Sequence, residues 1–146
     1  MRSRKRAEAN EEFAGAAKPN KYKAEPVYLD GLRFASEIEA HRYLYLKDRE
    51  RRGEIRNLAC QTRLYCAING KKVWYLQPDY RFYDNVLVRT VFEDTKGMCI
   101  GPAWQMFSLK KKTVEALYGI TIDVVTKGAW QKPYKEIVKL ARTTGL

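Results

Sequence analysis

The chain has 146 residues, of which 45% are apolar, and it carries a formal net charge of +11. This length and composition predict one domain with a hydrophobic core. No apolar run approaches the roughly 18 residues of a membrane-spanning helix, and no apolar segment follows the basic N-terminus as in a secretory signal. We therefore expect a cytoplasmic protein with no membrane association.

The cysteine and histidine content excludes several kinds of site. Three cysteines without a Cys-x-x-Cys spacing, together with a single histidine, argue against a zinc site and predict reduced thiols. A lone histidine also makes a Ser-His-Asp mechanism a poor fit. The sequence pI near 9.6 instead favours nucleic acid as the partner, the alternative being a basic surface that serves solubility.

The first half of the chain predicts an arm, a hairpin and a helix. Residues 1–24 are polar and basic and predict a flexible arm outside a single domain at 25–146. Val27 to Phe34 predicts a hairpin that turns at Asp30-Gly31. A helix is expected from Ser36 to Arg52, with Gly53 after its end. Ser36 and Glu39 have the spacing of a capping box, in which each side chain bonds the other residue's amide.

The remaining elements follow from apolar periodicity and turn residues. Strands are expected at Glu54–Ala67, Val73–Tyr83 and Val86–Lys96, with turns at Asn69-Gly70 and Asp84-Asn85. A helix at Ala103–Tyr118, a strand at Ile120–Val125 and a helix at Pro133–Arg142 complete the chain. The predicted fold class is α/β, with an αβββαβ core whose mixed sheet is flanked by helices.

Two carboxylates and a lysine are the candidate catalytic residues. Strand alternation predicts that Asp94 and Lys96 share a face, while Glu93 points the opposite way and forms a salt bridge. Asp79 is expected on the preceding strand, on the face of Tyr75, Gln77 and Arg81. Neighbouring carboxylates favour a divalent cation, and Mg²⁺ prefers one or two carboxylates plus water and phosphate oxygens. The alternative is an exposed ion pair between Asp79 and Lys96.

The same residues carry a family resemblance. Pro78-Asp79 followed by Asp94-Thr95-Lys96 resembles the signature of the PD-(D/E)XK nuclease superfamily, whose restriction-endonuclease-like core has the αβββαβ order. Phe34-x-Ser36-x-x-Glu39-Ala40-x-Arg42-Tyr43, Asp94-Thr95-Lys96-Gly97 and Tyr118-Gly119-Ile120 resemble a small phage-encoded family of that superfamily. The order of a Ser-x-x-Glu helix followed by an acidic-x-Lys-Gly strand end is also similar to the order of motifs in phage endonucleases that resolve Holliday junctions.

The resemblance implies roles for two further residues. It places Glu39 at the metal beside Asp79 and Asp94, whereas the capping box explains Glu39 without catalysis. It also places a lysine at Lys110, which could reach the scissile phosphate. The alternative for Lys110 is a packed stem with its ammonium in water.

These observations predict an Mg²⁺-dependent phage-type DNA endonuclease, with Mn²⁺ as a possible substitute. The resemblance implies a branched substrate such as a four-way junction, and two matched nicks predict a homodimer. The alternatives are a non-catalytic nucleic-acid-binding module and a restriction or mismatch nuclease that cuts plain duplex. The candidate contacts to DNA phosphates are Arg42, Arg52, Arg63, Lys111 and Lys112.

Overall fold

A computed structural model of the protein describes residues 25–144, so the predicted arm at 1–24 lies outside the described residues. Four strands form the central sheet in the order β3 (Ile55–Cys60), β6 (Tyr80–Asp84), β7 (Arg89–Thr95) and β8 (Ile122–Val125). Helix α2 (Glu37–Arg51) precedes β3, and α3 (Gly101–Tyr118) connects β7 to β8. Helix α3 carries the chain back to the end of the sheet at which β7 begins, so β8 runs parallel to β7. The other two pairs of the sheet are antiparallel. The predicted mixed α/β fold and its αβββαβ order are confirmed.

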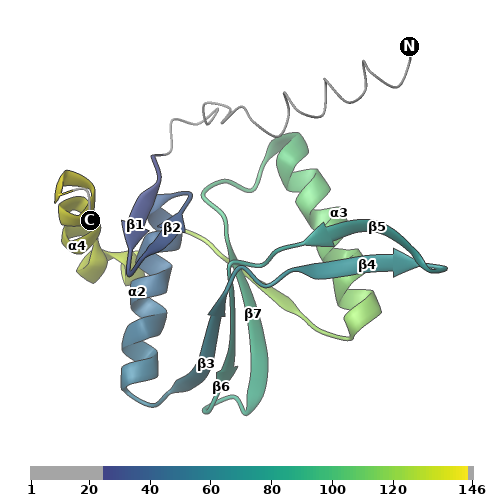
Figure 1. Ribbon diagram of the computed structural model, residues 1–146, viewed down its shortest axis with the longest axis horizontal. Helices are drawn as coiled ribbons and strands as arrows, with labels where there is room; N and C mark the ends of the chain where they lie inside the picture. Colours follow the sequence, from purple (N-terminus) through teal and green to yellow (C-terminus); the bar gives the residue numbers. More distant parts are fainter. Residues whose placement is uncertain (1–24, 145–146) are drawn as a thin grey trace.

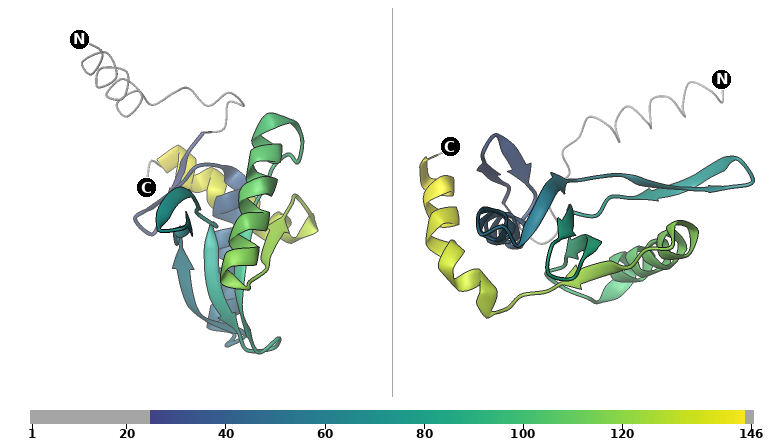
Figure 2. Two further views of the ribbon diagram at one scale, coloured as in Figure 1. Left: turned by 90° about the vertical axis from the view of Figure 1, so that its right-hand side faces the viewer. Right: turned by 90° about the horizontal axis from the view of Figure 1, so that it is seen from below.

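The two helices cover opposite faces of this sheet (Figures 1 and 2). Tyr80, Phe82 and Val91 pack in one core with residues of α2, among them Tyr43 and Leu46. On the other face, Phe92 and Ile122 pack with Phe107 and Val114 of α3. Alternation along the strands supplies both cores, because neighbouring side chains point to opposite faces of a sheet.

The predicted first hairpin and helix are confirmed, with small adjustments. Strands β1 (Val27–Leu29) and β2 (Leu32–Phe34) pair antiparallel. Val27 and Phe34 are buried in the core that contains α2, so these side chains serve the fold rather than a subunit interface. The Ser36 hydroxyl accepts a hydrogen bond from the Glu39 amide at 3.4 Å and caps α2, and Gly53 follows the helix end with a φ of +74°.

Two of the predicted strands are wrong in extent, because each is two strands. Glu54–Ala67 divides into β3 and β4 (Leu64–Ile68), and Val73–Tyr83 divides into β5 (Lys71–Leu76) and β6. Pro78 interrupts the second, since proline lacks an amide donor and restricts the residue before it. Strands β4 and β5 pair only with each other and turn at Asn69-Gly70 as predicted. This ribbon extends away from the central sheet and crosses α3 (Figures 1 and 2).

Element ends elsewhere also differ from the prediction. Strand β7 begins at Arg89 rather than Val86, because the Asp84 carboxylate accepts hydrogen bonds from the Val86 and Leu87 amides and holds a turn there. Strand β8 begins at Ile122 rather than Ile120. Pro133 lies in a 3₁₀ helix, η1 (Ala129–Tyr134), and α4 (Lys135–Thr144) begins after it. Within residues 25–144, no helix combines the length and apolar character needed to cross a bilayer.

Candidate active site

The structure brings Asp79 and Asp94 together at one end of the two inner strands of the sheet, where β6 begins and β7 ends. Asp79 does not lie on a strand as predicted; it lies in the segment between β5 and β6. Its Oδ2 accepts hydrogen bonds from the backbone amide of Thr95, at 2.7 Å, and from the Thr95 hydroxyl, at 2.6 Å. Since Thr95 directly follows Asp94 at the end of β7, these two bonds hold Asp79 beside Asp94.

The electrostatics of this end of the sheet disfavour two negative charges. Burial, followed by the nearby charges of Asp94 and Glu39, raises the pKa of Asp79 to about 8, although the Thr95 hydrogen bonds act in the opposite direction. Burial also raises the pKa of Asp94, against the effect of Lys96. Repelling carboxylates that a protein keeps together and away from water are typical of a functional site.

Lys96 is the counter-charge of Asp94. Its Nζ lies 2.7 Å from Asp94 Oδ2, in keeping with the predicted shared face, although β7 ends at Thr95 and Lys96 lies directly after it. The ammonium also lies 4.1 Å from the centroid of the Phe107 ring on α3. The predicted salt bridge of Glu93 on the opposite face is confirmed, and its partner is Arg42 on α2.

Glu39 approaches the same centre from α2. Its Oε2 accepts a hydrogen bond from the Ala35 amide at 3.3 Å, so the predicted capping box is half formed: the carboxylate reaches back one residue beyond Ser36. Burial and the charge of Asp94 raise the pKa of Glu39, while Lys96 lowers it. The capping role and the proximity to Asp94 are therefore both present.

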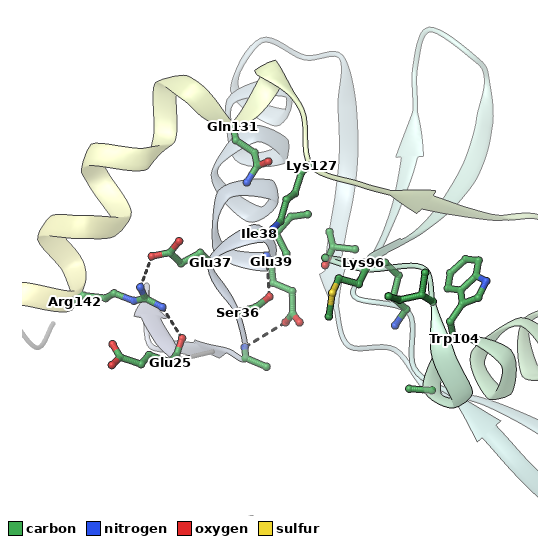
Figure 3. Close-up of a pocket in the computed structure, with 16 residues that line it drawn as sticks. Glu25, Ser36, Glu37, Ile38, Glu39, Lys96, Trp104, Lys127, Gln131 and Arg142 are labelled. Atoms are coloured by element: carbon green, nitrogen blue, oxygen red, sulfur yellow. Dashed lines mark hydrogen bonds and ion pairs between the residues drawn. The ribbon is translucent and has the colours of Figure 1, made fainter. Parts of the chain in front are cut away.

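Glu39, Thr95 and Lys96 line a cleft of about 910 Å³ (Figure 3). Glu39 enters it from α2, and Lys96 enters it from the chain after β7. Asp79 and Asp94 lie behind this surface, tied to it through Thr95 and Lys96. Other side chains of the cleft come from distant parts of the sequence, among them Trp104, Lys127, Gln131 and Arg142.

The carboxylates fit a divalent cation as a two-ligand site. In the part of the chain that the structure describes, no three His, Cys, Asp or Glu side chains converge closely enough to hold a metal ion. However, Asp94 Oδ2 is buried without a hydrogen bond of good geometry, and Lys96 is its close cation. One or two carboxylates with water and phosphate oxygens are the usual donors of Mg²⁺, and Asp79 and Asp94 match that set. Glu39 does not complete a third direct ligand.

The structure separates the other predicted residues from this centre. Arg42 does not project toward solvent: its guanidinium donates to both Glu93 carboxylate oxygens, at 2.7 and 2.8 Å, and its side chain is only 12% exposed. Lys110 is half-buried on α3 and does not line the cleft. Lys111 pairs with Glu115 on the same helix. Arg52 and Arg63 are exposed, as is Lys112.

Three residues that sequence reasoning did not assign support the site. Thr95 holds Asp79 in place with two hydrogen bonds, and its position inside the Asp94-Thr95-Lys96 motif is the sequence signal that indicates this role. Tyr80, which follows Asp79, donates its hydroxyl to the Glu39 carbonyl at 2.5 Å and fixes α2 against the sheet. Gln131 bonds the buried His41, whose pKa is lowered by burial, and so ties η1 to α2 beside the cleft.

Comparison with known proteins gives one match. No curated protein and no solved structure is significantly similar to the chain. Residues 19–131 match the family DUF1064, described as proteins of unknown function. The matched segment contains Glu39, Asp79, Asp94 and Lys96, together with every element of the central sheet. The chain therefore belongs to the DUF1064 family.

Proposed function

We propose that the protein is an Mg²⁺-dependent DNA endonuclease of the PD-(D/E)XK superfamily. The observation that carries the proposal is the meeting of Asp79 with the Asp94-Thr95-Lys96 segment at one end of the sheet, through Thr95 bonds of 2.6 and 2.7 Å and a Lys96 contact of 2.7 Å. A helix, three antiparallel strands, a helix and a parallel strand carry these residues. That order, with the two motifs converging, supports membership of the superfamily.

The residues present supply a division of labour for phosphodiester hydrolysis. Asp79 and Asp94 would hold Mg²⁺, which when bound polarises the phosphate and neutralises charge on it. Lys96 offers a positive charge at the cleft surface, where it stabilises negative charge that develops on the phosphate. Glu39, whose raised pKa gives it a higher proton affinity, hydrogen-bonds a water in the cleft. By the superfamily resemblance, cleavage leaves a 5′-phosphate and a 3′-hydroxyl.

Branched DNA is the proposed substrate, and a homodimer in the cytoplasm of a phage-infected cell is the proposed acting form. Both follow from the resemblance to phage junction-resolving endonucleases and from the need for two matched nicks. The formal net charge of +11 supports a polyanionic substrate, since positive charge raises the local concentration of such a substrate and speeds its association with the protein.

The decisive experiment compares cleavage of linear duplex, single strand, flap and four-way junction by the full chain, in Mg²⁺, in Mn²⁺ and in EDTA. We expect metal-dependent cutting, fastest on the junction, that is abolished in Asp79→Asn, Asp94→Asn and Lys96→Met while folding and DNA binding persist. Lys132→Gln, at an exposed lysine of η1, is the charge control and should cut like the parent.

The other outcomes separate the rival functions. Efficient cutting of linear duplex identifies a restriction or mismatch nuclease. DNA binding without cutting in either metal identifies a non-catalytic binding module. Retention of full activity by the Asp79→Asn variant would falsify the metal role of that carboxylate.

A further inference from the structure

The ribbon of β4 and β5 has two unlike faces. Leu64, Cys66 and Leu76 are buried on the inner face, where they pack in one core with Phe107 and Val114 of α3. This packing fixes the ribbon against the helix, and Figure 1 shows the ribbon crossing α3 and reaching outward from the central sheet. The other face is not covered by the described part of the chain and carries a row of aromatic and basic side chains.

This outer row consists of Arg63, Tyr75, Tyr65 and Lys72, in that order toward the turn. Tyr65 and Tyr75 are cross-strand partners with ring centroids 5.8 Å apart, and they are 40% and 45% exposed. The Arg63 guanidinium lies 4.9 Å from the Tyr75 ring centroid, and Lys72 Nζ lies 4.7 Å from that of Tyr65. Each cation is therefore held over a ring, in the cation–π arrangement.

A break in the strand register brings Lys72 into this row. Cys66 pairs with Trp74 and Ala67 pairs with Lys72, so Val73 has no partner and forms a bulge. Without the extra residue, strict alternation would place Lys72 on the same face as Trp74 and Leu76. The bulge turns Lys72 to the opposite face, which is a common use of this irregularity near binding sites.

The charge of the ribbon has one sign. Between Glu54 and Asp79 the sequence contains no acidic residue, while it contains Arg56, Arg63, Lys71 and Lys72. Arg63 is oriented further by the hydrogen bond that its Nε donates to Gln77 at 3.0 Å. Among the described residues, Arg63 and Lys72 form no salt bridge with a carboxylate, and such pre-positioned, exposed cations suit an anionic partner.

We propose that the outer row of the ribbon binds the phosphate backbone of double-stranded DNA. The inference rests on the proposed function for the choice of DNA, and it adds a binding surface apart from the cleft. The ribbon holds Arg63 and Lys72 at a fixed separation on one face, where both can contact the regular array of phosphates of a duplex. The two tyrosines orient Arg63 and Lys72 rather than stacking on bases, because each ring already has a cation over it.

The test measures duplex binding by the full chain in EDTA, where no cleavage occurs, over a range of salt concentrations. Each neutralised phosphate contributes about 0.9 to the slope of log affinity against log salt. Arg63→Gln/Lys72→Gln should therefore bind more weakly, with a slope shallower by roughly 2. Tyr65→Leu/Tyr75→Leu keeps the charges and should lose affinity a few-fold with the slope nearly unchanged.

Lys132→Gln/Lys139→Gln is the charge-matched control, since both lysines are exposed and lie on η1 and α4 away from the ribbon. An equal change of slope in the ribbon and control variants, or none in the ribbon variant, overturns the proposal. A loss on single strands that greatly exceeds the loss on duplex, in the tyrosine variant, also overturns it in favour of base stacking. Melting temperatures report whether each variant is folded.

The two proposals can fail separately. If the parent protein binds duplex through the ribbon but cuts no DNA in Mg²⁺ or Mn²⁺, the nuclease assignment fails and the ribbon surface stands. If the parent cuts DNA while the Arg63→Gln/Lys72→Gln variant binds with an unchanged slope, the ribbon surface alone is wrong.

Discussion

At the scale of single residues, the site depends on carboxylates that the fold keeps together against their repulsion. Asp79 is held by two bonds from Thr95, and Asp94 is held by Lys96. Neither interaction removes the cost of placing two negative charges in a buried site. A bound cation removes that cost, so metal binding and stability should be linked.

This linkage predicts a pH dependence. The pKa of Asp79 is about 8 in the folded state and near 3.8 when unfolded, so the folded protein binds the proton more tightly. Stability in EDTA should therefore fall as the pH rises between these two values, by a few kcal/mol, since one pKa unit corresponds to about 1.4 kcal/mol. The Asp79→Asn variant lacks this titration, while its Oδ1 can still accept both Thr95 bonds. Urea unfolding across the pH range should show that the free energy of unfolding of Asp79→Asn increases relative to that of the parent as the pH rises.

Asp123→Asn is the control, because this carboxylate of β8 is 42% exposed and should leave the pH profile unchanged. Added Mg²⁺ should stabilise the parent at the high-pH end but leave the Asp79→Asn variant unaffected. Parallel stability curves for the parent and Asp79→Asn throughout the range would contradict the buried-carboxylate account.

At the scale of elements, the orientation of α2 decides where Glu39 lies. Tyr80 bonds the Glu39 carbonyl, and Arg42, one turn along, bonds Glu93 on β7 with two hydrogen bonds. Arg42 also lies over the rings of Tyr45 and Trp130, at 4.3 and 5.0 Å from their centroids. Arg42 thus links α2 to the sheet and to η1, and its side chain is only 12% exposed.

The Arg42–Glu93 pair gives a prediction that separates stability from DNA binding. Removing one partner of a buried ion pair leaves an uncompensated charge, so Arg42→Ala should cost about 3 kcal/mol of unfolding free energy. Arg52→Ala removes an exposed arginine at the end of the same helix and should cost under about 0.5 kcal/mol. Urea unfolding measures the difference. DNA binding below the melting temperatures should weaken for Arg52→Ala and not for Arg42→Ala, and the reverse order would restore Arg42 as a DNA contact.

The elements also show what the sequence could and could not predict. Local signals placed α2 well, because Ser36 and Gly53 mark its ends chemically. The turn of the ribbon at Asn69-Gly70 is predicted correctly, but its separation from the central sheet is not. The alternation of apolar and polar residues continues through Gln77-Pro78-Asp79, although a proline inside a strand pattern is a warning of a break. The bulge at Val73 has no comparable sequence signal, since it depends on pairing with β4.

At the scale of the whole molecule, the candidate site lies where the two helical layers meet one end of the sheet. The pairing of Asp94 with Lys96 could be predicted, because the two residues are two positions apart at the end of one strand, Asp94 within β7 and Lys96 directly after it. The cleft could not, because its lining runs from Glu25 to Arg142 and only the tertiary fold brings these positions together. The ion pair of Glu37 with Arg142, which joins α2 to α4 at the cleft, is an example of such a long-range contact.

Resolution of a junction sets a requirement on the assembly as a whole. Under the proposed function, one carboxylate centre per chain would cut one strand. A four-way junction needs two nicks in symmetry-related strands, so two-fold symmetry is the simplest solution. Light scattering should therefore give the mass of a dimer for the full chain, or for its complex with a junction in EDTA. The hairpin at Val27–Phe34 is a poor candidate for the contact, because Val27 and Phe34 are buried within the protomer's own core. A monomeric mass in both states, together with single nicks as the only products, would instead describe a nicking enzyme.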